Sequence, residues 1–180
     1  MDTGHGALGD FESGQLPDPE WLELACLGGV LPRGVQAALD AAAGCWHEDA
    51  AAEGHLATAF AQAPEHPAVH IAWYRFLFYK NRLDEALAVG MRCLARAAAD
   101  NGLPDDWRTV GRDQASFSSW SAVPRFYLFT LKGCAYLSLR LGQLEQGGAM
   151  LAKLRELDPQ DRLGGSVLQA VLARQGEDDD

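Results

Sequence analysis

The residues of this chain that could do chemistry are few, and their spacing favours no particular reaction. His66 and His70 lie four positions apart, a spacing at which two side chains on one helix can bind a metal ion. Pro67 is typical of the first turn of a helix, so His66 is predicted to precede that helix, and no third ligand is apparent. We therefore predict no metal site and no cofactor.

The other reactive groups have structural explanations. Asp84 and Glu85 are predicted to begin a helix, where carboxylates interact favourably with the helix dipole. No glycine-rich phosphate-binding loop follows a strand, and no strand is predicted. The four cysteines lie far apart without CxxC spacing, and we expect reduced thiols: Cys26, Cys45, Cys93 and Cys134. We assign no catalytic residue and predict that the protein is not an enzyme.

Composition excludes several classes of protein. The chain has 180 residues, enough for one domain with a hydrophobic core, and a net charge of -10, which disfavours nucleic-acid binding. The start of the chain lacks the basic and apolar regions of a secretory signal, so we expect a cytoplasmic protein. The most apolar stretch, 126–142, contains Lys132 and Arg140 and is shorter than the roughly 20 residues needed to cross a bilayer. We expect no membrane association.

The rest of the pattern predicts helices separated by short turns. Residues 1–17 are predicted to be a flexible arm, and 18–28 a short helix. Three antiparallel helix pairs follow, with helices at about 35–46, 47–64, 66–79, 83–99, 125–141 and 143–158. A last amphipathic helix at about 162–173 is predicted to cap the third pair. Residues 176–180 are predicted to be an acidic tail, which leaves one helical domain over 18–175 with an insertion at 101–122.

Internal similarity links the pairs. Residues of similar kind recur 34 positions apart: His47 and Asn81, Ala52 and Ala86, Ala59 and Cys93, Phe60 and Leu94. The second and third pairs match at an offset of 61, which is one period plus an insertion of 27: Asn81 and Gly142, Leu83 and Leu144, Asp84 and Glu145, Ala86 and Gly147. Asn81 and Gly142 stand where the turn of each pair needs a left-handed residue.

The third pair resembles the tetratricopeptide repeat (TPR) family. Residues 128–159 carry its pattern of small and apolar positions: Leu131, Cys134, Ala135, Gly142, Leu144, Gly147, Leu151, Leu154, Leu157, Asp158 and Pro159. The middle repeat departs at Gly90, where a large apolar residue is usual, and the first repeat, about 33–64, matches only in its second half. The resemblance implies an all-α superhelix of about three helix hairpins, with a short helix before them and a capping helix after.

The same resemblance implies a binding surface. In this family the first helix of each pair lines a concave groove that holds a peptide or partner segment. The corresponding residues include Ala68, Ile71 and Leu139 and, as the predicted partner-binding set, Arg75, Phe78, Tyr79, Phe129, Lys132, Tyr136 and Arg140. Cations among aromatic rings suit an acidic or amphipathic protein segment. The alternative is that these cations pair with the chain's own acids and that the rings pack internally.

The insertion at 101–122 has two interpretations. Loops of this length are uncommon unless they function or pack as a unit. Its aromatic residues could anchor a partner over the groove: Trp107, Phe117 and Trp120. Alternatively, they cover the edge of the repeats as a structural patch.

Taken together, these patterns favour a bacterial, cytoplasmic interaction module that acts as an adaptor, assembly factor or small chaperone. In length and charge it is similar in type to the acidic three-repeat chaperones of secretion systems, although the insertion departs from their contiguous arrays. Two other hypotheses remain. The repeats could build a homo-oligomer such as a homodimer, or an active site could lie beneath the insertion, using His66, His70 or an insertion aspartate.

Overall fold

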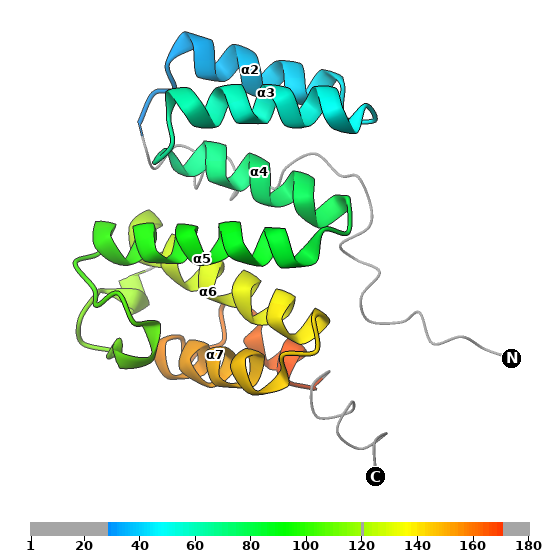
Figure 1. Ribbon diagram of the computed structural model, residues 1–180. Coiled ribbons are helices and arrows are strands. Elements are labelled where there is room, and N and C mark those ends of the chain that lie inside the picture. The colour runs from blue at the N-terminus through cyan, green and yellow to red at the C-terminus, as the bar shows by residue number, and fades with distance from the viewer. Residues whose placement is uncertain (1–28, 120, 171–180) are drawn as a thin grey trace, which may run out of the picture.

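The computed structural model describes residues 29–119 and 121–170, and every regular element within those ranges is helical. Figure 1 shows the helices stacked in chain order in a single column. Their bounds are α2 Arg33–Gly44, α3 Asp49–Gln62, α4 Pro67–Tyr79, α5 Leu83–Asp100, η3 Trp107–Thr109, η4 Phe117–Ser119, α6 Ala122–Arg140 and α7 Leu144–Leu157. The all-α prediction is confirmed. The predicted arm at 1–17, helix at 18–28, tail at 176–180 and Trp120 lie outside the described residues.

Consecutive helices pack as hairpins. α2 packs along α3, α4 along α5 and α6 along α7, while α3 also contacts α4 and α5 contacts α6. The hairpins therefore join through the second helix of one and the first helix of the next, as the column in Figure 1 shows. Within residues 29–119 and 121–170, no helix is long and apolar enough to cross a membrane.

The offset of 61 between the second and third hairpins extends to individual hydrogen bonds. The Arg82 N–H donates to the Leu77 carbonyl at 2.9 Å, and the Gln143 N–H donates to the Ser138 carbonyl at 2.8 Å. Both turns contain a residue in the left-handed region, Asn81 with φ 57° and Gly142 with φ 75°. Each bond runs from the third residue after the helix back to its last turn, as in a Schellman motif. The two turns are the same structure, as predicted.

The first hairpin keeps the 34-residue period in its helices but not in its turn. α2 and α4 begin at Arg33 and Pro67, and α3 and α5 begin at Asp49 and Leu83, so both pairs of helices start 34 residues apart. The sequence match of His47 to Asn81 does not extend to their backbone conformations, so this part of the prediction is wrong. Asn81 has a positive φ, and His47 is not among the described residues that do. Instead, the Glu48 N–H donates to the Cys45 carbonyl at 2.8 Å.

Two predicted helix boundaries are corrected. α6 begins at Ala122 rather than after Pro124, because a proline in the first turn needs no N–H partner. The last helix begins at Gly165 rather than Arg162 and continues to Ala170, the last described residue. Asp161, with φ 52°, sets this start, because its carboxylate accepts a hydrogen bond from the Ser166 N–H at 3.1 Å. The predicted extension to residue 173 lies outside the described residues.

Small residues allow the helices of a hairpin to approach closely. A Cβ added at Gly147 of α7 would lie 2.6 Å from Leu139 Cδ2 and 3.2 Å from the Ala135 carbonyl oxygen, both in α6. The equivalent residues in the first and second hairpins, Ala52 and Ala86, have no exposed surface. Gly90 serves a similar contact, because an added Cβ would lie 3.0 Å from Cys134 Sγ. A glycine at position 90, where the TPR pattern usually has a large apolar residue, thus allows α5 to lie close to α6.

Replacing Gly147 by valine is expected to lower the free energy of unfolding by about 1–3 kcal/mol, because the new side chain must displace Leu139 and meets backbone. Urea denaturation would measure the difference. Gly54→Val is the matched control, because Gly54 lies in α3 with nothing within 4 Å of an added Cβ. Equal stability of the two variants would contradict close packing at Gly147.

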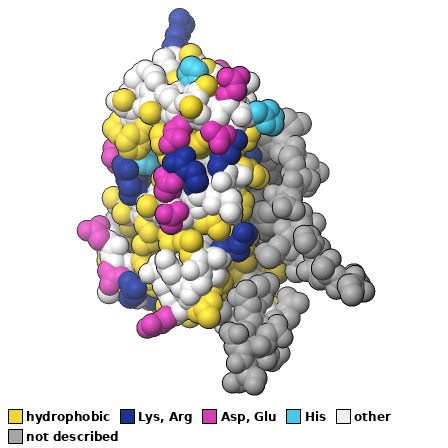
Figure 2. Space-filling model, turned by 45° about the vertical axis from the view of Figure 1, so that its right-hand side comes forward, with side chains coloured by type: hydrophobic (Ala, Val, Ile, Leu, Met, Phe, Trp, Pro, Cys, Tyr) yellow, Lys and Arg dark blue, Asp and Glu magenta, His cyan; other side chains and the backbone are white. Residues whose placement is uncertain are grey.

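The negative charge of the protein belongs mainly to its ends. Of the 25 acidic side chains, six lie in residues 1–28 and four in residues 177–180, which leaves 15 between them. All 15 Lys and Arg also lie between them, and all except Arg174 lie within residues 29–170, so residues 29–170 are close to neutral. On the face shown in Figure 2, basic side chains accordingly lie beside acidic ones.

Candidate functional site

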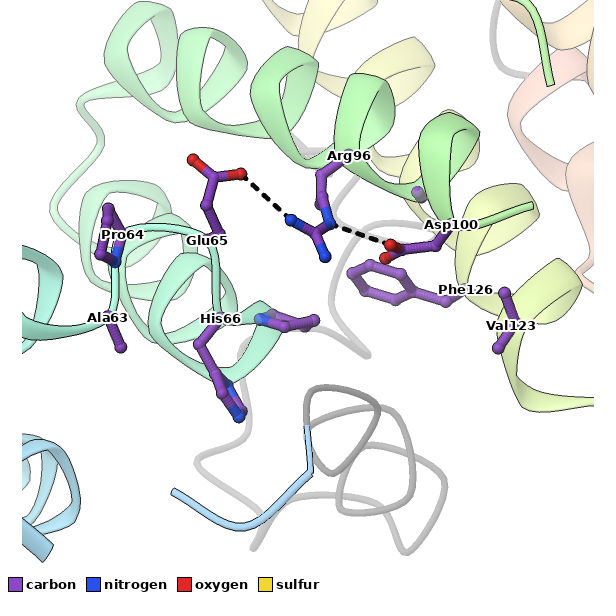
Figure 3. Close-up of a pocket in the computed structure, with 10 residues that line it drawn as sticks. Ala63, Pro64, Glu65, His66, Arg96, Asp100, Val123 and Phe126 are labelled. Atoms are coloured by element: carbon purple, nitrogen blue, oxygen red, sulfur yellow. Dashed lines mark hydrogen bonds and ion pairs between the residues drawn. The ribbon is translucent and has the colours of Figure 1, made fainter. Parts of the chain in front are cut away.

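A cavity of about 510 Å³ lies where the start of α4, the end of α5 and the start of α6 meet (Figure 3). Its apolar wall includes Val123 and Phe126 of α6. Its polar wall is an ion-pair chain in which Arg96 bridges Glu65 at 3.4 Å and Asp100 at 2.9 Å. Because the arginine is already paired with two carboxylates, this wall offers no unsatisfied positive charge to a ligand.

His66 and His70, the two histidines with metal-ligand spacing, line different cavities and make different contacts. His66 lines this cavity, and its Nδ1 accepts a hydrogen bond from the Ala68 N–H at 3.2 Å, so it caps α4. His70 lines a different cavity of about 150 Å³, where its ring meets that of Phe60 edge-on at 5.7 Å. Among the residues that the structure describes, no group of three or more His, Cys, Asp or Glu could hold a metal ion.

His70 should make stability depend on pH. It is 4% exposed, and burial lowers its pKa, with further lowering by Arg92 and Arg96 against the opposing effects of the Pro64 carbonyl and Glu65. As the pH falls below 6.5, His70 therefore becomes protonated in the unfolded chain while it is still neutral in the folded chain. Stability is expected to fall as pH drops below about 6.5 until the lower folded pKa is passed.

Thermal unfolding at pH 7.5, 6.5 and 5.5 tests this expectation. His70→Phe keeps a ring against Phe60 but removes the titrating group, so its melting temperature should fall less on acidification than that of the wild type. The range stays above the acidic pH at which the carboxyls with lowered pKa, Asp161 and Glu85, become protonated. Identical pH dependence of both proteins would exclude His70 as the cause.

A cluster of aromatic rings joins the C-terminal halves of α4 and α6. Tyr74 and Phe78 are stacked with ring centroids 6.2 Å apart, and Phe78 contacts Tyr79 at 5.5 Å and Tyr136 at 6.0 Å. We call these four rings the aromatic surface. Residues four apart on a helix share a face, which is why Tyr74 and Phe78 stack. Of the four rings only Tyr79 is exposed, at 47%, and the other three are half-buried.

Two arginines flank the aromatic surface. The Arg75 guanidinium lies over the Tyr79 ring at 5.9 Å, and the Arg140 guanidinium lies over the Tyr136 ring at 5.7 Å. Arg140 also donates a hydrogen bond to the Tyr136 hydroxyl at 2.8 Å. Arginine retains its charge and several donors when it stacks on a ring. The structure thus brings together five of the seven predicted partner-binding residues: Arg75, Phe78, Tyr79, Tyr136 and Arg140.

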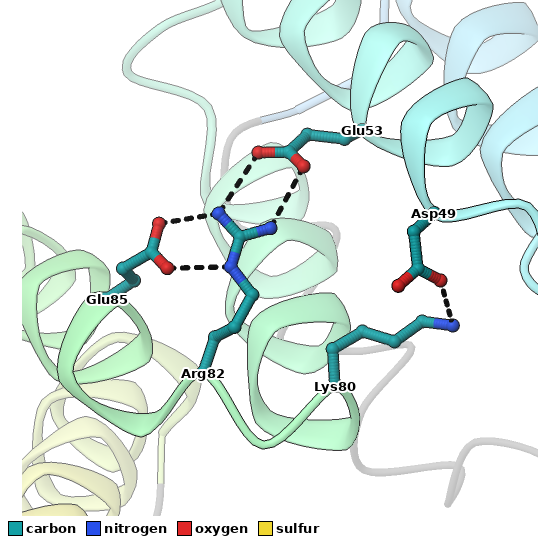
Figure 4. A network of polar contacts seen from close by, with 5 residues as sticks. All are labelled: Asp49, Glu53, Lys80, Arg82 and Glu85. Carbon is teal, nitrogen blue, oxygen red and sulfur yellow. Dashed lines mark hydrogen bonds and ion pairs between the residues drawn. The ribbon is translucent and has the colours of Figure 1, made fainter.

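Other cations near the end of α4 pair with the chain's own acids, as the alternative interpretation expected for this face. Figure 4 shows Lys80 paired with Asp49 at 2.5 Å, and Arg82 between Glu53 at 2.9 Å and Glu85 at 2.6 Å. The hydrogen bonds to both glutamates hold the pKa of Arg82 above its usual value. These contacts connect α3 to the α4–α5 turn. Their role is therefore to join the first and second hairpins.

Lys132 and Phe129 do not join the aromatic surface. The Lys132 ammonium donates a hydrogen bond to the Leu163 carbonyl, and burial lowers its pKa, partly offset by Asp161. The predicted groove role of Lys132 is corrected, because its side chain fastens the segment after α7. Phe129 is half-buried at the edge of the main core. Ala68 and Ile71 are 6% and 8% exposed, so they offer a partner little surface.

The insertion forms part of the core. Trp107 and Phe117 are each 5% exposed, and Val110 between them is fully buried. η3 packs on α7 and η4 on α6, and the Phe117 ring lies 6.0 Å from that of Tyr127. Lys153 of α7 donates a hydrogen bond to the Val110 carbonyl at 2.9 Å. The predicted role of Trp107 and Phe117 as partner anchors is corrected, since both face inward, as a structural patch would.

Sequence reasoning missed two contributors to this site. Tyr74 had a signal, because it lies four residues before Phe78 and so on the same helix face. Burial raises the pKa of its hydroxyl far above the usual value. No sequence signal pointed to Trp46, because it belongs to the α2–α3 turn in another hairpin. Its ring centroid nevertheless lies 6.2 Å from that of Tyr79 and 5.5 Å from that of Phe76.

Comparison with known proteins gives one informative similarity. The chain is 39% identical over 129 residues to an uncharacterised 19.8 kDa protein in the nifW 5′ region of Azotobacter chroococcum mcd 1. The match covers 71% of this chain and 72% of that protein. No model of a protein family matches the chain. No solved structure matches it either.

Proposed function

This chain belongs to the same family as the Azotobacter chroococcum protein, and we propose that it is a TPR-like interaction module that binds an acidic, amphipathic protein segment. The observation that carries the proposal is the aromatic surface, on which two arginines flank four rings at the end of α4 and α6. The module acts as an adaptor, assembly factor or small chaperone and performs no chemistry of its own.

The TPR-like arrangement is supported by the repeated hairpins. The second and third turns share their hydrogen bonds and their left-handed residues at an offset of 61. The small residues Ala52, Ala86 and Gly147 are buried at equivalent positions of the three second helices. In solenoids of this kind, stacked hairpins expose a continuous face of first helices to partners. The aromatic surface lies on two such helices, α4 and α6.

The chemistry of the partner follows from the side chains on that surface. The exposed Tyr79 ring, with the half-buried rings beside it, favours apolar anchors such as leucine or tryptophan, because rings supply large contact area at low entropic cost. The guanidinium groups of Arg75 and Arg140 favour carboxylates placed beside those anchors. An amphipathic helix with acidic flanks presents both kinds of group at intervals of three or four residues.

Charge reversal tests the proposal. The double variant Arg75→Glu and Arg140→Glu should lose at least 90% of the partner retained by the tagged wild type in a pull-down, because each substitution replaces attraction of a carboxylate by repulsion. Since the relative lies in the nifW 5′ region, the product of a nifW gene is the first purified protein to offer.

The matched control reverses two charges elsewhere. Arg33→Glu and Arg112→Glu change the net charge equally at exposed residues of α2 and the insertion. The control should retain the partner, and circular dichroism should show that both variants are folded. If both double variants lose the partner equally, attraction by overall charge explains the binding and the proposed surface is wrong.

A further inference from the structure

We propose that residues 18–28 of the chain itself, with the sequence DPEWLELACLG, bind the aromatic surface and compete there with the partner segment. This inference rests on the proposed function, because it assigns a regulator to the same surface. It follows from the charge of the chain's beginning, the point at which the described residues begin and the composition of the segment.

Charge is the first argument. Residues 1–28 contain six acidic side chains and no lysine or arginine, and three of the acids lie within the segment: Asp18, Glu20 and Glu23. Residues 29–170 are nearly neutral, with 15 acids against 14 basic residues. Within that nearly neutral body, the guanidinium groups of Arg75 and Arg140 lie over the Tyr79 and Tyr136 rings of the aromatic surface. A guanidinium on a ring can still donate hydrogen bonds to a carboxylate.

Reach is the second argument. The Gly29 carbonyl lies 3.4 Å from His66 Nε2, so the first described residue, which directly follows the segment in the sequence, lies beside the start of α4. The 13 residues of α4 span about 20 Å from there to the aromatic surface. The eight residues from Trp21 to Gly29 span about 12 Å as a helix and at most about 29 Å when extended. Trp21 can therefore reach the aromatic surface when the residues between it and Gly29 are largely extended, although the sequence pattern predicts a helix at 18–28.

Composition is the third argument. The segment combines apolar and acidic side chains, with Trp21, Leu22 and Leu24 close to its three acids. These are the groups that the rings and arginines of the surface favour in a partner. A tethered segment experiences an effective concentration on the order of millimolar, so even a weak contact would keep the surface largely occupied.

The test uses the full chain and a fluorescein-labelled peptide of residues 16–28. In the variant Trp21→Glu and Leu24→Glu, the segment loses its apolar anchors, so the peptide should bind about tenfold more tightly than to the wild type. Adding Arg75→Glu and Arg140→Glu to that variant should abolish peptide binding. Fluorescence anisotropy measures all three affinities, and circular dichroism verifies folding.

Two outcomes would overturn the inference: equal peptide affinity for wild type and the Trp21→Glu, Leu24→Glu variant, or no binding to either. As a second measurement, a photo-crosslinking amino acid at position 21 should attach to peptides of α4 or α6, and attachment elsewhere would also overturn it. None of these outcomes removes the proposed function, which fails separately if partner capture is unaffected by Arg75→Glu and Arg140→Glu.

Discussion

Replacing Trp107 by alanine is expected to lower the free energy of unfolding by about 3–5 kcal/mol, a large part of the stability of a single domain. Trp107 is 5% exposed and belongs to the main core, and η3 packs on α7. Removing the indole would leave a cavity that the short η3 helix cannot fill without losing its contact with α7. Denaturation in urea, followed by circular dichroism of the helices, measures the loss.

The control for Trp107→Ala is Arg112→Ala, which removes an exposed side chain from the same insertion. Its effect should stay within about 0.5 kcal/mol, as for other surface substitutions. A loss below about 1 kcal/mol in Trp107→Ala would mean that the insertion is not part of the cooperative core.

The second large effect is expected on binding rather than on stability. Tyr79→Ala should weaken the affinity for the captured partner by about 2 kcal/mol, roughly 30-fold, because exposed aromatic side chains beside arginine are typical hot spots of interfaces. Its effect on folding should be small, since 47% of the residue is exposed. Titration calorimetry gives the affinity and thermal unfolding gives the stability.

Two comparison variants separate these effects. Phe76→Ala removes a ring with no exposed surface from the same helix and should cost several kcal/mol of stability. Val167→Ala removes another exposed apolar side chain, 58% exposed, from the last helix and should leave the partner affinity unchanged. If Tyr79→Ala and Val167→Ala bind the partner alike, the aromatic surface is not the interface.

Local signals in the sequence were sufficient to predict the six helices α2–α7 and the turns of the second and third hairpins, but not the turn of the first. The offset of 61 predicted the two left-handed turns at Asn81 and Gly142, because a helix reversal of that kind depends on a few adjacent residues. Helix ends were less predictable. Pro124 was read as preceding its helix, but it lies in the first turn, where the missing N–H costs nothing.

Contacts between distant segments were harder to predict. A repeat pattern assigns Lys132 to the inner face, but it cannot indicate that the segment after α7 returns to accept its hydrogen bond at Leu163. Similarly, Trp107 and Phe117 in a polar loop suit either a partner or the core, and only the packing against α6 and α7 decides between them. The five predicted residues that the structure brings together share two neighbouring first helices, for which the repeat gives the facing sides.

Site-specific photo-crosslinking at position 79 tests the central claim most directly. A photoreactive aromatic residue at Tyr79 is predicted to give one main adduct with a second protein in the native host, attached to an acidic amphipathic segment, besides the link to residues 18–28 of its own chain. The same residue at exposed His55 of α3 should give no such adduct. An adduct of twice the chain's mass would instead indicate a homodimer. The same adducts from both positions, or none from position 79, would contradict the account.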